Sequence, residues 1–194
     1  LATWARAPID DSLIPARAEL LQAMVRFDLP VGFWSTPHPY KEFSLTANAY
    51  RLRIPLTVHP GIGYDIIYNH HFANGAALGR GADIDYRVFA KSIGQMDGGV
   101  FLSIGSAIMA PQIFEKALSF ANNLRLQKGQ DIIKPFIAVN DLAPVGWDWS
   151  RGEPPKNNPA YYLRFCKTFS RMGGKMVYAG GDNKVLLHNL YHNL

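Results

Sequence analysis

The chain has 194 residues, of which 48% are hydrophobic and 18% are charged, a balance typical of a soluble globular protein with a sizeable core. Its net charge of +5 is moderate, and its lysines and arginines are scattered rather than clustered, which argues against a nucleic-acid partner. The single cysteine, Cys166, excludes an internal disulfide and a cysteine-based zinc cluster.

Neither a membrane span nor a secretory signal is visible in the sequence. No apolar run approaches the roughly 20 residues that cross a bilayer, and the chain does not open with a basic segment followed by an apolar one. We therefore expect a cytoplasmic protein with no membrane partner. We also expect one domain over residues 1–194, with the alternative that these residues are the C-terminal part of a longer chain, because the sequence begins at Leu1.

The first part of the chain predicts a helix, a loop, a second helix and a strand. Acidic residues precede apolar ones at helical spacing between Ile9 and Phe27, which predicts a capped amphipathic helix. An ordered loop rich in aromatics and proline is expected over Phe33–Tyr40, and a helix over Ser44–Leu52. The stretch Ile54–Val58 predicts a buried strand, which a Pro-Gly-Ile-Gly turn ends before a helical apolar face begins at Asp65.

The second part alternates helices and strands. We expect helices over Asp83–Met96, Pro111–Gln127 and Ala160–Arg171, strands over Gly99–Ile104, Pro135–Val139 and Met176–Ala179, and a short terminal helix. The stretch Pro144–Pro159 shows no helix or strand signal, and its Trp, Asp, Arg and Glu side chains suggest a recognition loop. Strands separated by helices predict an α/β fold in which helices cover both faces of a parallel sheet.

Small residues follow three of the predicted strands. They are Gly61 and Gly63 with Asp65, then Gly105 with Ser106, and finally Gly180 and Gly181 with Asp182. Open parallel sheets bind ligands at the carboxyl ends of their strands, and glycines let a backbone approach a ligand closely. The pattern therefore favours a nucleotide-like ligand at that edge, although each turn alone also fits a simple tight turn.

From about Ser44 to Leu187 the segments resemble the C-terminal half of deoxyhypusine synthase, an NAD-dependent enzyme with a Rossmann-like fold. The stretch from Ile54 to Phe72 is similar to the family's Ile-Pro-Val strand and its Asp-Gly-Ser-x-Gly-Asp-Met-Ile-Tyr turn, so that Gly61 and Asp65 match the turn's first Gly and last Asp. Gly98 to Ala107 resembles the strand before the family's Gly-Gly-Gly-x-x-Lys-His-His segment. Val139-Asn140 resembles its Ile-Asn-Thr strand end.

The resemblance assigns the catalytic lysine to Lys167. In the family a Trp-Gly-Lys motif precedes a Val-Tyr-Ala strand, and here Phe165-Cys166-Lys167 precedes Val177-Tyr178-Ala179 at the same spacing. The family reaction implies that NAD takes a hydride from an amine and that this lysine captures the aminobutyl fragment as an imine. Such a lysine must react as a neutral amine, which an apolar setting favours. Asp65 would orient the donor amine, and Gly61, Gly63, Gly105, Ser106 and Asp182 would line NAD.

Two departures from the family pattern bear on the substrate. The first Asp of the ligand turn is replaced by Pro60, and the Lys-His-His segment falls on Met109-Ala110-Pro111. The acidic residues that hold spermidine in the family fall near Pro154 and Tyr161, which leaves Asp65 as the matching carboxylate. A buried ammonium without counter-charges is costly, so we expect a polyamine-type donor other than spermidine itself.

The resemblance also implies partners. We expect a small-molecule amine or polyamine as donor, a protein lysine as a possible acceptor, and a homo-oligomer, because the family's active sites lie between subunits. Two alternatives stay open, namely a homospermidine synthase-like polyamine enzyme and a non-catalytic nucleotide-binding relative. His59, Asp65 and the Asn69-His70-His71 run could form a metal site, but this alternative is weaker because no established ligand spacing occurs there. We therefore expect no bound metal.

Overall fold

The computed structural model describes residues 12–33 and 35–194. The first residues of the helix predicted from Ile9 lie outside this range. The contacts group the chain into two compact units, Leu1–Asp85 and Tyr86–Leu194, which are described in turn. The expectation of a single domain stays a prediction.

The helices of the first unit are α1 (Ile14–Arg26), α2 (Leu45–Leu52) and the first part of α3 (Gly75–Gly94), with short 3₁₀ turns η1 (Lys41–Phe43) and η2 (Ile66–Asn69). Ser44 caps α2, because its hydroxyl accepts a hydrogen bond from the Ala47 N–H at 3.3 Å. Helix α1 begins instead at Leu13, which provides no side-chain cap, with a proline in its first turn. A bidentate ion pair, with Arg80 Nη2 2.7 Å from Glu19 Oε1, connects α1 to α3.

The predicted strand over Ile54–Val58 is wrong. These residues have no strand partner in the described part of the chain, and Ile54, Leu56 and Val58 are 58%, 43% and 55% exposed. Part of the reason is chemical, because Pro55 has no N–H to donate and the Val58 N–H donates to the Asp85 carboxylate at 2.8 Å. The helical face predicted from Asp65 is only the single turn η2, and the next helix, α3, begins earlier than expected, at Gly75.

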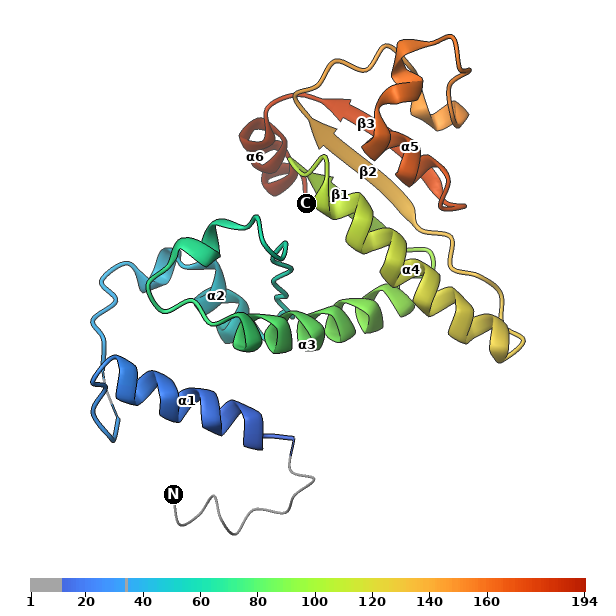
Figure 1. The fold of residues 1–194 in the computed structure, drawn as a ribbon. Coiled ribbons are helices and arrows are strands. Elements are labelled where there is room, and N and C mark those ends of the chain that lie inside the picture. The colour runs from blue at the N-terminus through green and yellow to red at the C-terminus, as the bar shows by residue number, and fades with distance from the viewer. Residues whose placement is uncertain (1–11, 34) are drawn as a thin grey trace. The chain divides into compact units, whose positions relative to one another are not determined.

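The second unit is built on a parallel sheet. Strands β1 (Val100–Ile104), β2 (Phe136–Asp141) and β3 (Lys175–Gly180) lie in the order β1-β2-β3, with Phe101 opposite Ile137 and Ile137 opposite Met176 (Figure 1). Helices α4 (Met109–Gln127) and α5 (Arg164–Ser170) connect them, and α6 (Asn183–Asn193) follows β3. The α/β class with a parallel sheet is therefore confirmed, with three strands where four were predicted.

One face of this sheet carries the core. Phe101 on β1 stacks on Phe114 of α4 with ring centroids 4.0 Å apart, and Phe169 of α5 lies against both rings. Helices α4 and α5 therefore cover the same face, as two crossovers of one hand between strands in chain order require. On the opposite face, Val100 and Leu102 are 57% and 44% exposed within the chain, so the expected two-sided cover is incomplete at β1.

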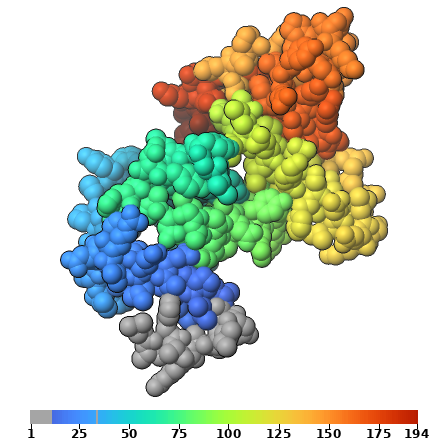
Figure 2. All heavy atoms as spheres, viewed as in Figure 1, coloured from blue at the N-terminus to red at the C-terminus, as the bar shows by residue number. Residues whose placement is uncertain are grey.

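The long loop after β2 is ordered. It contains two 3₁₀ turns, η3 (Trp149–Arg151) and η4 (Pro159–Tyr162), so the helix predicted over Ala160–Arg171 is divided into η4 and α5. The indole of Trp149 anchors the loop in the core at 2% exposure. In the space-filling view the orange atoms of this loop and of α5 form one closely packed group (Figure 2).

Candidate functional site

The carboxyl edge of the sheet in the second unit brings together three predicted site residues. Gly105 follows β1 with φ +62°, and its N–H donates to the Asn140 carbonyl at 3.0 Å. The left-handed backbone at Gly105 favours glycine, and a Cβ atom there would also displace the Asn183 side-chain amide at the start of α6. Asp182 is the residue just before Asn183, so the start of α6, which follows β3, lies against the end of β1 at this edge.

Ser106 and Asp182 each cap a helix that begins at the edge. The Ser106 hydroxyl accepts the Ala110 N–H at 3.0 Å in the first turn of α4, and the Asp182 carboxylate accepts the Lys184 N–H at 2.7 Å in the first turn of α6. Helix N-termini carry unpaired N–H groups and a partial positive charge. Two such termini therefore begin on the side of the sheet where an anionic group of a ligand would bind.

Asn140, at the end of β2, is a further residue of this edge that the sequence reasoning did not single out as a site residue. It is 4% exposed, and its amide nitrogen donates to the Ala179 and Gly181 carbonyls at 2.8 and 3.2 Å. Because both neighbours are acceptors, the orientation of the amide is fixed. Its Oδ1 atom is buried and accepts no hydrogen bond from the described residues, and the same holds for Asn183 Oδ1. Two buried acceptors at the edge thus lack a donor.

The other predicted site residues lie in the first unit. The Gly61 carbonyl accepts the Asp65 N–H at 3.1 Å, Gly63 has φ +86°, and the Asp65 carboxylate accepts the Ile67 N–H at 3.1 Å. A Cβ at Gly61 would fall on the Tyr64 ring. These glycines therefore shape a tight turn, and Asp65, the residue expected to orient a donor amine, caps η2.

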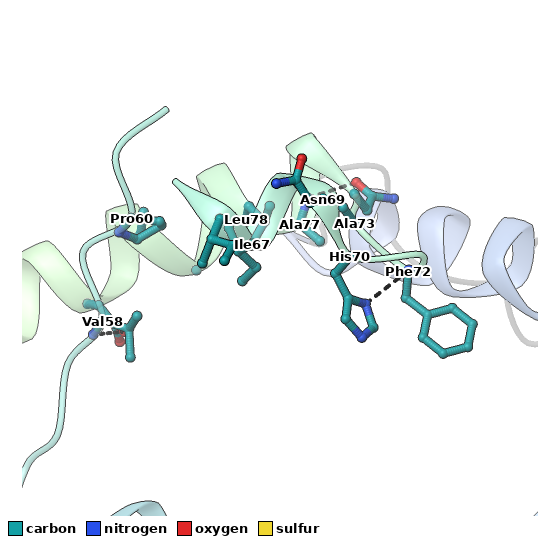
Figure 3. Close-up of a pocket in the computed structure, with 14 residues that line it drawn as sticks. Val58, Pro60, Ile67, Asn69, His70, Phe72, Ala73, Ala77 and Leu78 are labelled. Carbon is teal, nitrogen blue, oxygen red and sulfur yellow. Dashed lines mark hydrogen bonds between the residues drawn. The ribbon is translucent and has the colours of Figure 1, made fainter. Parts of the chain in front are cut away.

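A hollow of about 980 Å³ lies in the same unit, between the residues around Val58, η2 and the first half of α3. Its lining is mainly apolar, and Figure 3 shows the His70 ring turned toward Phe72, whose N–H donates to His70 Nδ1 at 3.1 Å. Neither the two glycines of the turn nor Asp65 lines it. Within the described ranges, no group of three or more His, Cys, Asp or Glu side chains is placed to hold a metal ion.

Lys167, the predicted nucleophile, is held by two partners in the second unit. Its Nζ atom lies 3.5 Å from Glu153 Oε1 and 3.3 Å from the centroid of the Tyr161 ring, and the side chain is 19% exposed. Both contacts are ones that an ammonium ion makes. Glu153 also receives a bidentate pair of hydrogen bonds from Arg171, each 2.7 Å long.

The electrostatics of this cluster follow from these contacts. Hydrogen bonding by Arg171, followed by the nearby positive charges of Arg171 and Lys167, holds the pKa of Glu153 below its usual value. The hydrogen bond from Lys167 lowers the pKa of Tyr161. Phe165 and Phe169 belong to the buried core, and the contacts of the Lys167 amine are the Glu153 carboxylate and the Tyr161 ring. Lys167 lines a pocket between α4 and α5, and the lining of that pocket includes neither Gly105, Ser106 nor Asp182.

The long loop and the cysteine serve the core of the second unit. The Trp147 indole donates to the Gly152 carbonyl at 2.8 Å, and the Asp148 carboxylate accepts from Ser150, so these loop side chains hold the loop together. Cys166 is fully buried, and burial raises the pKa of its thiol to about 12. Cys166 is therefore a core residue, and its thiol lacks the exposure and the lowered pKa of a reactive cysteine.

No protein-family model, curated protein or solved structure gives a significant match to this chain. None of the helices in residues 12–33 and 35–194 combines the length and the apolar character that crossing a membrane requires.

Proposed function

We propose that this chain binds NAD at the carboxyl edge of its parallel sheet and uses it for aminoalkyl transfer from a polyamine-type donor, as in the deoxyhypusine synthase family that its sequence resembles. The observation that carries the proposal is the buried Oδ1 atom of Asn140, which accepts no hydrogen bond at the edge where α/β proteins bind nucleotides. A ligand with a hydroxyl or amide N–H group would donate the missing hydrogen bond to this Oδ1 atom.

The residues at the edge fit the parts of NAD. The N-termini of α4 and α6 would receive its pyrophosphate, and the Asp182 carboxylate would accept a ribose hydroxyl with the oxygen that is not engaged in capping. Asn140 would accept from a second hydroxyl or from the carboxamide. When bound, NAD would supply a hydride acceptor for an amine substrate.

Lys167 has to leave Glu153 before it reacts as a nucleophile. Its ammonium is paired in this structure, and its pocket includes Met172 and Gly173, which precede β3, but no residue of the carboxyl edge. The transferase proposal therefore requires that the donor amine or a second subunit take over the Glu153 carboxylate, and that Lys167 act on NAD bound by a second subunit. A protein lysine or a free diamine would then serve as the acceptor, the latter in the homospermidine synthase-like alternative. The homo-oligomer expected from the resemblance belongs to this proposal.

Calorimetric titration with NAD tests the binding step. Binding would also be visible in unfolding experiments, because NAD at 100 times its dissociation constant would add about 2.7 kcal/mol to the free energy of unfolding. We expect Asn140→Ala to weaken NAD binding about ten-fold, because one buried hydrogen bond is lost. The matched control Asn189→Ala, on an exposed position of α6, should leave the affinity unchanged. Equal NAD affinities of the two variants would show that NAD does not bind at the carboxyl edge of the sheet.

A non-catalytic nucleotide-binding relative is the second candidate, and the ion pair of Lys167 with Glu153 favours it. Borohydride reduction separates the two candidates. With NAD and a polyamine present, a transferase yields a reduced adduct on Lys167 that is absent from the Lys167→Arg variant. NAD binding without any adduct on a panel of diamines and polyamines would support the non-catalytic candidate.

A further inference from the structure

A polar pocket of about 590 Å³ lies between α4 and α5 in the second unit. Its size is within the range of small-molecule sites. Arg164 and Lys167 line it from α5 and Arg171 from the C-cap of that helix, and spacings of three and four residues place them on one side of the helix. Glu115 is the acidic residue of the lining, and its carboxylate already lies 3.5 Å from the Lys116 ammonium.

The three cations are not fully neutralised. Glu153 pairs with both Lys167 and Arg171, at 3.5 and 2.7 Å. Among the described residues, the ion pairs involve other cations and Arg164 makes none with a carboxylate. With one carboxylate shared between two cations and a third cation left over, the pocket has an excess of positive charge.

Neutral hydrogen-bond donors complete the lining. Asn122 Oδ1 accepts the Ile133 N–H at 2.9 Å, which leaves the amide nitrogen of Asn122 to donate into the pocket. Ser119 and Thr168, which carry hydroxyls, line the same space. Arginine, lysine and hydroxyl donors around one space match the several acceptor oxygens and the double charge of a phosphate group.

We infer that this pocket binds a small phosphate monoester, with Arg164 as the principal charged donor and Lys167 and Arg171 as supporting donors. Glu153 already shows how the Lys167 and Arg171 pair receives an anion, because its carboxylate accepts two parallel hydrogen bonds from Arg171. Phosphate binding here does not depend on NAD binding, since the pocket lining shares no residue with the carboxyl edge of the sheet, but Lys167 is common to this pocket and to the transferase proposal.

Calorimetric titration of the full chain with glycerol 3-phosphate, and with glycerol as the uncharged comparison, tests this inference. Loss of a charge-assisted hydrogen bond in Arg164→Ala should weaken binding about ten-fold or more. Glu153→Gln removes a competing carboxylate and should strengthen binding. Lys128→Ala, which removes one exposed positive charge outside the pocket, is the matched control and should leave the affinity unchanged.

Three outcomes would overturn the inference: no heat of binding with glycerol 3-phosphate, equal weakening by Arg164→Ala and Lys128→Ala, or no gain in Glu153→Gln. Circular dichroism of each variant checks that the fold is kept. NAD titration of the Arg164→Ala variant distinguishes the two sites, because an unchanged NAD affinity together with weaker phosphate binding separates this pocket from the sheet edge.

Discussion

Asn140 offers the sharpest test of the described edge, because its side chain joins β2 to the end of β3 from a position that is 4% exposed. Replacement by alanine removes two hydrogen bonds, each worth about 1 kcal/mol net. It also removes the unpaired Oδ1 acceptor, whose desolvation costs about 1 kcal/mol or more. We therefore expect the free energy of unfolding of the second unit to fall by only about 1 kcal/mol in Asn140→Ala.

Asn140→Asp keeps the shape of the side chain but replaces the amide donor with a carboxylate that can only accept hydrogen bonds. A carboxylate in that position would face two carbonyl oxygens with no donor, so the folded state would hold a proton on it and its folded pKa would rise above the unfolded value of about 3.9. The protonated form is the stable one, and stability is lost as the pH rises from that value through the raised folded pKa. At pH 7 we expect a loss of at least about 3 kcal/mol.

Urea denaturation followed by tryptophan fluorescence measures both variants, since the buried Trp149 reports on the second unit. Asn189→Asp on the exposed side of α6 provides the charge control. If Asn140→Asp unfolded at the same urea concentration as the parent protein at pH 7, with no dependence on pH, the side chain would not face the two carbonyls and the described edge would be incorrect.

Three further predictions concern the core and the charged cluster of the second unit. Phe114→Ala, at a side chain that is 0% exposed, should cost about 3–5 kcal/mol in urea denaturation, and Phe120→Ala, at one that is 50% exposed, about 1 kcal/mol; equal costs would contradict the described core. Native Cys166, with a thiol pKa of about 12, should resist Ellman's reagent at pH 8 until urea unfolds the chain, and fast native labelling would place the thiol at the surface. Because Arg171 lowers the pKa of Glu153, the pair should stabilise the fold above the ordinary value of 4.5 and lose this effect as the pH falls through the lowered folded pKa. Glu153→Gln should flatten that acid dependence, and superimposable acid titrations of the two proteins would refute the ion pair.

The sheet and helices of the second unit were largely predictable from the sequence. The strand predicted over Gly99–Ile104 is β1, and the helix predicted over Pro111–Gln127 is α4, in which Phe114, Ala117 and Leu118 are buried. These predictions succeed because hydrophobic periodicity reports on burial against one core. The parallel direction of the three strands follows from their alternation with helices.

The errors have a different origin. Ile54–Val58 has the composition of a strand. A strand also needs a neighbouring strand to pair with its backbone N–H and C=O groups, and the local sequence does not show whether such a strand exists. The ion pair of Lys167 with Glu153 could not be predicted either, because Glu153 lies in a loop for which the sequence indicates no regular structure. Asn140 at the end of a strand has the sequence signature of a turn residue, and only its burial and its two acceptor neighbours distinguish it.

The strand order of the second unit matches the order in which a ribosome makes the strands. Each new strand can add to the outer side of the previous one as soon as its crossover helix has formed, so no later segment has to be inserted between two strands that have already paired. The nascent chain can therefore assemble this sheet progressively, and stalled chains that end after β2 should already protect the β1 and β2 amides from hydrogen exchange.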